Sequence, residues 1–153
     1  MESASKRVKK SNADFIPREP EHQWELDIVK LIDTKPDHRS IHWYWSEGGQ
    51  IEIPLFKWLF SKRKVHFLNA NANDIKHRVV RMKIKPTICV MRYTDASQID
   101  YKLLAEIKDG LFFSPKYKPA QVLMNHPQVI VLANCEPDQT RMSADRWKIT
   151  RMD

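Results

Sequence analysis

The sequence predicts an α/β fold with a mostly parallel central sheet, and three observations predict it. Three short apolar segments rich in β-branched or aromatic residues are typical of buried strands, at 41–45, 87–91 and 128–133. Helical patterns follow the first two, and strands that alternate with helices favour parallel pairing. Two adjacent glycines, Gly48 and Gly49, separate the first strand from a helix that Pro54 opens.

Periodicity and capping residues predict the remaining elements. The expected helices are 24–32, 54–60, 74–82 and 100–108, with a short strand at 65–68 and a hairpin of strands 111–114 and 120–124. Asn73 or Asp74 caps the third helix, whereas Asp100 caps the fourth and Gly110 ends it.

Length and composition limit the kinds of function that the chain can have. A chain of 153 residues with 42% hydrophobic and 29% charged residues fits one soluble globular domain. It has no apolar segment of the roughly 20 residues that a membrane span needs. Cys89 and Cys135 each lie in an apolar segment, which favours buried thiols over a disulfide. The six histidines lack ligand spacing, so no metal site is expected.

The net charge of +7 favours an anionic partner, nucleic acid first, with a basic surface that has no partner as the alternative. Residues 1–20 are polar and contain four closely spaced cations: Lys6, Arg7, Lys9 and Lys10. They predict a disordered basic arm, which serves nuclear import or nucleic-acid binding, or is a plain solvated tail.

The glycine segment has the layout of a phosphate-binding loop, in which backbone N–H groups and a helix N-terminus hold phosphates. Such a loop ends in Gly-Lys-Ser/Thr. Here those places fall on Ile51, Glu52 and Ile53, after Gly48, Gly49 and Gln50. Glu52 repels a triphosphate and Ile53 has no hydroxyl for Mg²⁺. The scaffold therefore predicts a nucleotide-binding element without its working residues.

Two further places in the middle of the chain are candidates for function. The strand at 87–91 runs into Arg92, where phosphate-loop ATPases carry a metal-holding acid; Asp95 is a possible substitute. The hairpin tip carries Lys116, Tyr117 and Lys118, which suits single-stranded nucleic acid, or is an ordinary surface turn.

Two residues near the end of the chain are also candidates. Asn134 ends the strand at 128–133, where an amide orients a water or touches a γ-phosphate, or forms a turn before Pro137. Arg146 either reaches a neighbour's nucleotide or makes a surface salt bridge.

Four segments together resemble a known family: residues 42–45, 103–117, 129–138 and 143–147. They are similar to the C-terminal helicase half of replication-initiator (Rep) proteins from small circular single-stranded DNA viruses, nanovirus-like and circovirus-like. The resemblance covers roughly residues 21–153. It implies a superfamily 3 helicase, an AAA+-like P-loop NTPase with a three-layer sandwich and a DNA-binding β-hairpin, which works as a ring on single-stranded DNA.

The resemblance also implies roles by position. Lys116 and its neighbours would contact DNA, Asn134 would be the sensor asparagine, and Arg146 the arginine finger. The helix at 24–32 resembles an oligomerisation element. The Walker A lysine and hydroxyl fall on Glu52 and Ile53, and the Walker B acid falls on or near Arg92. No nicking motif of the family precedes residue 20, so nicking and joining activity is not expected.

The leading expectation is a Rep-like helicase domain with a degenerate nucleotide site, which binds single-stranded DNA and contacts copies of itself or intact Rep, with little ATPase activity. No cofactor is expected. ATP and Mg²⁺ would be bound only if the nucleotide site still works. The alternatives are an active helicase with an unusual nucleotide site, or a non-functional integrated viral remnant. The expected location is the host nucleus, or otherwise an intracellular soluble compartment, without a membrane partner.

Overall fold

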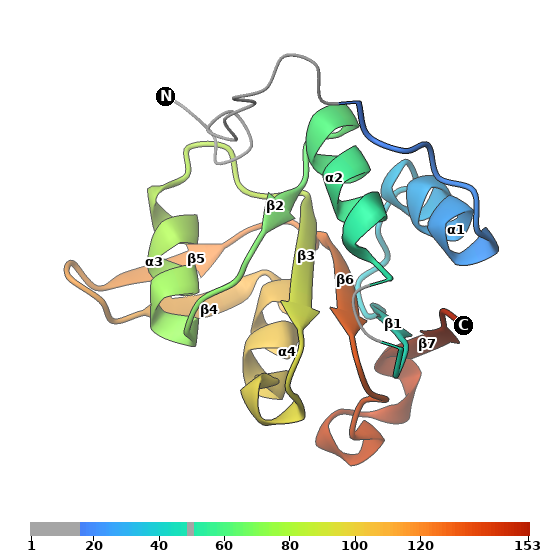
Figure 1. Ribbon diagram of the computed structural model, residues 1–153. Helices are drawn as coiled ribbons and strands as arrows, with labels where there is room; N and C mark the ends of the chain where they lie inside the picture. The colour runs from blue at the N-terminus through green and yellow to red at the C-terminus, as the bar shows by residue number, and fades with distance from the viewer. Residues whose placement is uncertain (1–15, 49–50) are drawn as a thin grey trace.

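The computed structural model describes residues 16–48 and 51–153 (Figure 1). Its helices are α1 (Gln23–Ile32), α2 (Ile53–Lys62), α3 (Ala72–Arg81) and α4 (Tyr101–Asp109). Its strands are β1 (Ile41–Trp45), β2 (His66–Phe67), β3 (Ile88–Tyr93), β4 (Leu111–Ser114), β5 (Ala120–Leu123), β6 (Gln128–Ala133) and β7 (Trp147–Arg151). Short 3-10 turns lie at Ala96–Gln98, Gln139–Arg141 and Ala144–Arg146.

Five strands form one parallel sheet in the order β2-β3-β6-β1-β7, and β4 pairs with β5 in a separate antiparallel hairpin. The long crossovers between neighbouring strands carry the helices, as parallel pairing requires. The predicted α/β class, with its mostly parallel central sheet, is therefore confirmed, and so is the position of the hairpin.

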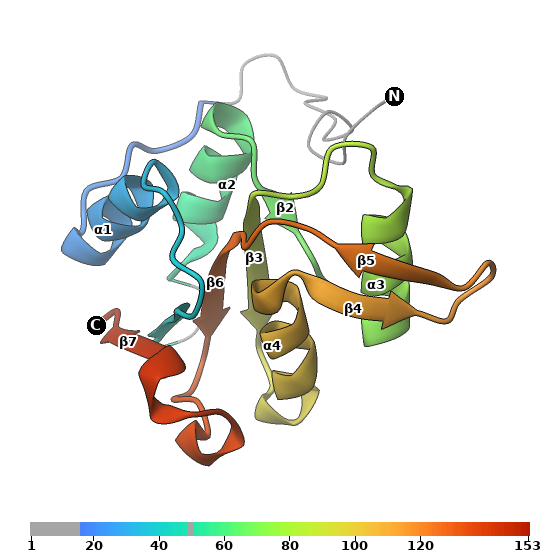
Figure 2. The ribbon, with the colours of Figure 1, turned by 180° about the vertical axis from the view of Figure 1, so that it is seen from behind.

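Helices cover both faces of the sheet, so the architecture has three layers. α1 and α2 pack on one face against Ile130 and Leu132 of β6. α3, α4 and the hairpin pack on the other against Val129 and Val131, and Figure 2 shows α4 and the hairpin from that side. All six residues of β6 are buried, because a central parallel strand is covered on both faces.

The ends of α4 confirm the capping prediction. Asp100 accepts a hydrogen bond from the Leu103 N–H, and Gly110 ends the helix at φ 70°. The cap of α3 differs from the prediction. It is Asn71, whose side chain accepts from the Asp74 N–H, rather than Asn73 or Asp74. In an Asn-rich segment each Asn suits a cap, and the packing of Ile75 and Val79 decides which one is used.

The sequence interpretation missed one strand, β7. Only Trp147 of its five residues is buried, so its pattern is that of a polar edge strand. Residues 1–15 of the predicted basic arm lie outside the described residues. Residues 16–20 are tethered: the Arg18 guanidinium donates to the buried Glu25 at 2.8 Å, and the Trp58 indole N–H donates to Glu19 at 3.2 Å.

Candidate functional site

The carboxyl ends of β1, β3 and β6 meet at one edge of the sheet. Trp45 and Tyr93, the last residues of β1 and β3, both align with Ala133 at the end of β6. Ligands of open α/β sheets bind outside the carboxyl ends of the strands. The candidate site is therefore this edge, called the carboxyl edge below.

The loop after β1 folds back on its own side chains. The Ser46 hydroxyl accepts from the Gly48 N–H at 3.0 Å and donates to Asp153 at 3.0 Å, so it ties the loop to the end of the chain. Gly49 and Gln50, two of the predicted nucleotide-binding residues, lie outside the described residues. The loop ends at Glu52, which directly precedes α2, and Pro54 occupies the first turn as predicted.

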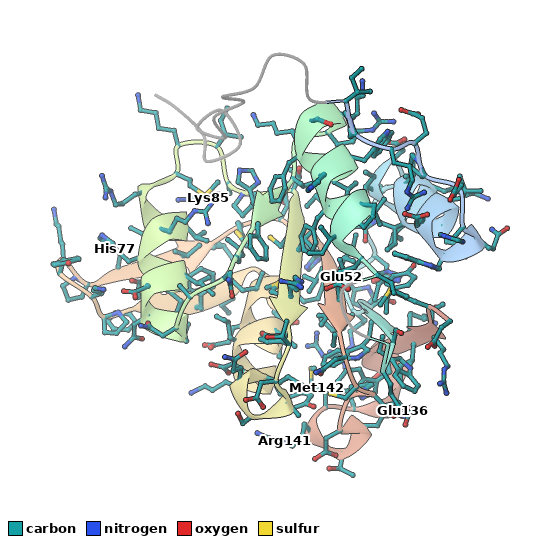
Figure 3. The ribbon with its side chains drawn as sticks, viewed as in Figure 1. Glu52, His77, Lys85, Glu136, Arg141 and Met142 are labelled. Atoms are coloured by element: carbon teal, nitrogen blue, oxygen red, sulfur yellow. The ribbon has the colours of Figure 1, made fainter. Side chains whose placement is uncertain are left out.

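Glu52 and Arg92 form an ion pair at this edge. Arg92 Nε donates to Glu52 Oε2 at 2.6 Å, and the side chains are 22% and 9% exposed, respectively. Figure 3 labels Glu52 close to β3, the strand that carries Arg92. The carboxylate lies at the N-terminus of α2, where the helix dipole and free N–H groups favour an anion. The Glu52 carboxylate, already paired with Arg92, is thus the anion at the start of this helix.

The neighbouring candidates do not complete a metal or phosphate site. Ile53 is the first residue of α2 and offers no oxygen ligand. Asp95 accepts from the Ser97 N–H at 3.0 Å, and this bond lowers the pKa of the Asp95 carboxyl. It caps a 3-10 turn beyond β3 and makes no bond to the Glu52–Arg92 pair. Within the described ranges, no three His, Cys, Asp or Glu side chains come together as metal ligands.

The carboxyl edge carries an excess of acidic side chains. Glu47, Glu52, Asp95, Glu136 and Asp153 all follow strand ends. Of the cations there, Arg92 is bound to Glu52, and Arg151 contacts Asp153 at 2.8 Å and Glu47 at 3.7 Å. Asp95 and Glu136 pair with no described cation. Such an edge repels a polyphosphate.

Asn134 and Arg146 lie apart from each other. Asn134 follows β6, and its amide donates to the Thr94 carbonyl at 2.6 Å, which links the ends of β6 and β3. Arg146 directly precedes β7, whose first residue aligns with Ile41, so it lies at the opposite edge. It is buried, and it donates to Asp109 at 2.7 Å and to the Arg39 carbonyl at 3.4 Å. In this position it does not project toward a neighbouring molecule.

At the hairpin tip the three predicted residues have different environments. The Lys116 ammonium bonds Asp74 of α3, and this bond raises the pKa of Lys116 and lowers that of Asp74. Tyr117 is 77% exposed at φ 58°, with its ring 4.8 Å from that of His77. Lys118 is exposed without an ion pair to a described residue. Tyr117 and Lys118 are thus the two that face solvent.

Sequence reasoning placed Glu52 and Arg92 individually but missed that they bond each other. The resemblance to Rep helicases contained the signal, since it implies a lysine at the position of Glu52 and an acid at or near Arg92. The Lys116–Asp74 and Arg146–Asp109 bonds, which span 42 and 37 residues, had no such signal, because no motif relates the two partners of either bond.

Sequence comparison identifies relatives of this chain among known proteins. The chain is 31% identical over 134 residues to Para-Rep C10 of the Milk vetch dwarf C10 alphasatellite, and 31% identical over 134 residues to Para-Rep C7 of the Faba bean necrotic yellows C7 alphasatellite. It is 29% identical over 130 residues to Para-Rep C3 of the Milk vetch dwarf C3 alphasatellite. Each match covers 82% of this chain and 46% of the relative.

The chain thus spans about half the length of the curated relatives it matches. No protein-family model matches it, and no solved structure matches it significantly. None of the helices in the described ranges is long and apolar enough to cross a bilayer. The parallel α/β sheet agrees with the relationship that the sequence indicates. The chain is a homologue of the Rep proteins of alphasatellites, over about half of their length.

Proposed function

We propose that this chain is a Rep-like helicase domain that acts in replication of circular single-stranded DNA without using ATP. One observation carries the proposal: the Glu52–Arg92 ion pair at the start of α2. It stands where a working domain needs a lysine and a metal-holding acid, and it leaves neither group available.

The energetics oppose nucleotide binding. Charge-assisted hydrogen bonds contribute about 1.5–3 kcal/mol each, so the missing lysine alone removes about one to two decades of affinity. A triphosphate would also have to separate Arg92 from Glu52, and breaking a buried pair costs about 3–5 kcal/mol. The surrounding acids add repulsion. We therefore expect no ATP hydrolysis.

The second candidate is an active helicase with an unusual nucleotide site. Asn134 favours it, because its amide lies at a strand tip and bonds the neighbouring tip, as a sensor side chain would. A phosphate-release assay with Mg²⁺-ATP and single-stranded DNA discriminates the two. Turnover that is lost in Asn134→Ala but kept in Asn73→Ala, an exposed Asn on α3 outside this edge, supports the active enzyme. No turnover in any form supports our proposal.

DNA contact at the hairpin rests on Tyr117 and Lys118. A Tyr in the left-handed region costs roughly 1–2 kcal/mol, and such strain is commonly kept where a side chain has a task. The exposed ring suits base stacking, and the free ammonium suits a phosphate. Lys116 instead holds the hairpin tip against α3 through Asp74.

Fluorescence anisotropy with labelled oligothymidine tests this contact. Tyr117→Ala with Lys118→Glu should weaken binding at least about tenfold, since each stacked base contributes about 1–3 kcal/mol. The matched control is Tyr44→Phe with Lys102→Glu, which removes no exposed ring and makes the same charge change. Equal effects of the two double variants would exclude the hairpin as a DNA contact.

We further propose that the domain associates with itself or with intact Rep rings. α1, which resembles an oligomerisation helix, uses Trp24, Ile28 and Ile32 within its own domain and leaves Leu26 46% exposed. An inactive subunit in a ring would lower the activity of its neighbours. The test is titration of this chain into an active Rep helicase: unwinding should fall with added chain, and Leu26→Glu should reduce the inhibition.

A further inference from the structure

We propose that the opposite edge of the sheet, where the strands begin, is a second contact surface for single-stranded nucleic acid. This surface, called the amino edge, is separate from the hairpin tip and from the Glu52–Arg92 pair. Three observations support it: unpaired cations, a continuous groove without acids, and a charge opposite to that of the carboxyl edge.

The fold gathers four chain segments at the amino edge. The strands are parallel, and the register pairs His66 with Cys89, Ile88 with Gln128 and Ile41 with Val129, so the segments that precede β2, β3, β6 and β1 lie side by side. α2 and α3, which cover opposite faces of the sheet, both end at this edge, in the upper part of Figure 1. Figure 3 labels Lys85, which follows α3, at this end of the molecule.

Exposed cations without an acidic partner are concentrated in these segments. They are Lys35, Lys62, Lys64, Arg81 and Lys83. None forms an ion pair with a carboxylate of the described residues, whereas the carboxylates nearby are already engaged. Asp33 lies 3.5 Å from Arg63, and Asp37 lies 3.7 Å from the ammonium of the buried Lys108. The edge therefore keeps an uncompensated positive charge, the electrostatic footprint of a nucleic-acid surface.

A groove runs along the same edge. A pocket of about 680 Å³ and one of about 500 Å³ share Thr87, Asn125 and His126, so they form one continuous depression between the segments before β3 and β6. No Asp or Glu lines either pocket. Ile84 and Leu123, which are 70% and 80% exposed, form an apolar wall.

Two features of the groove suit bases. The rings of His38 and His126 lie 6.1 Å apart, and an imidazole ring offers a face on which a base can stack. The Gln128 side chain, at the wall of the smaller pocket, donates to the Leu31 and Thr34 carbonyls, but its buried Oε1 has no partner among the described residues. Lys85 is not one of the contacts, because its ammonium already donates to three carbonyls at the end of α3.

The groove, rather than the charge, favours nucleic acid over an acidic peptide. An acidic peptide matches separate cations equally well, but its carboxylate side chains have no flat ring to place in an apolar groove. Unpaired bases can enter an apolar groove between the cations, whereas a duplex keeps its bases stacked inside. The proposal does not need the hairpin contact to be correct.

The test uses the full chain with labelled oligothymidine at several salt concentrations. Lys64→Glu with Lys83→Glu is the edge variant. Lys102→Glu with Arg141→Glu, on α4 and in the 3-10 turn after β6, makes the same charge change away from the amino edge. The edge variant should lose at least about tenfold in affinity, and the slope of log K against log salt should fall by about 1.4, since each phosphate contact on a single strand contributes about 0.7. The control should lose much less.

Equal losses in the edge and control variants would overturn the inference, because the effect would then follow net charge alone. Loss in the hairpin variant without a specific loss in the edge variant would do the same and leave the proposed function standing. A specific loss of binding to labelled polyglutamate with unchanged DNA binding would identify an acidic protein as the partner and overturn the inference. Lys64→Gln with Lys83→Gln, checked by circular dichroism, repeats the test if the Glu variant folds poorly.

Discussion

Arg92 Nε lies 2.6 Å from Glu52 Oε2, a bond between the strand β3 and the first turn of α2. It joins two positions that are 40 residues apart. In phosphate-loop ATPases a lysine at the start of the helix binds phosphate and an acid at a strand end holds Mg²⁺. Under the proposed function, Glu52 and Arg92 stand at these two places with the charges exchanged. In this chain Glu52 and Arg92 pair with each other, so neither charge is available to a ligand at the carboxyl edge.

The ion pair should contribute to stability in a way that a double-mutant cycle reveals. Arg92→Met leaves Glu52 largely buried without its cation, so the free energy of unfolding should fall by about 3 kcal/mol. Glu52→Gln with Arg92→Met should lose less than the sum of the single variants, by about 1 kcal/mol or more. Urea titration measures all forms, and strict additivity would show that the pair does not interact.

Exchanging the two charges should create affinity for a polyphosphate. Glu52→Lys with Arg92→Asp keeps an ion pair but places the cation at the start of α2, where a phosphate can reach it. Inorganic triphosphate should then raise the melting temperature of the double variant and leave that of the native chain unchanged. An equal response of the two proteins would show that another site binds the anion.

His66 should make the fold sensitive to acid. It is 3% exposed, and neither ring nitrogen has a hydrogen-bond partner among the described residues. Burial, followed by the charges of Arg78 and Lys64, lowers the pKa of His66 to about 4. Since the unfolded value is near 6.5, the neutral ring stabilises the fold fully above about pH 6.5, and this is lost as the pH falls toward 4. The change in unfolding free energy is about 3 kcal/mol.

His66→Phe should flatten that pH dependence, as chemical denaturation at several pH values can measure. His42, whose pKa burial also lowers, is present in both proteins and cancels in the difference. A variant with the native pH profile between about pH 4 and 6.5 would show that His66 is not the acid-sensitive group.

Gly110 should tolerate no side chain. Its φ is 70°, and an added Cβ would collide with the Met124 carbonyl. Gly110→Ala should therefore lower the unfolding free energy by about 2 kcal/mol or more, through backbone strain and the forced shift of β5. Gly48→Ala is the matched control, with an ordinary contact to Ser46 and an expected change within about 0.5 kcal/mol. Similar losses in thermal melts would refute the argument.

Tyr117→Asn should separate stability from DNA binding. Asn tolerates the left-handed region better than Tyr, so the unfolding free energy should stay equal or rise by a few tenths of a kcal/mol. Affinity for oligothymidine should fall at least about fivefold, because the exposed ring is gone. Unchanged affinity with raised stability would mean that the ring has no role in binding.

Local signals predicted most of the fold. The Asp100 cap and Gly110 fixed the ends of α4, because both act through their own backbone neighbours. β7 escaped prediction because a half-exposed edge strand such as Trp147–Arg151 has no continuous apolar pattern, and its pairing with β1 depends on residues far along the chain.

The site was predictable only in part, for the same reason. Position along the chain placed Glu52, Arg92 and Asn134 at the carboxyl edge, as the structure has them. It could not show which charges meet: Arg146 stands next to Asp145 in sequence, yet Asp145 bonds Arg39 and Arg146 bonds Asp109. Ion-pair partners that lie on different elements are brought together by the assembled sheet, and the spacing of residues along the chain does not reveal them.

Isothermal titration calorimetry of the native chain with Mg²⁺-ATP tests the central claim most directly. If the Glu52–Arg92 pair closes the nucleotide site, ATP should give no saturable heat, which corresponds to a Kd above about 1 mM. Saturable binding in the micromolar range, lost when Asn134 is changed to Ala, would contradict the account.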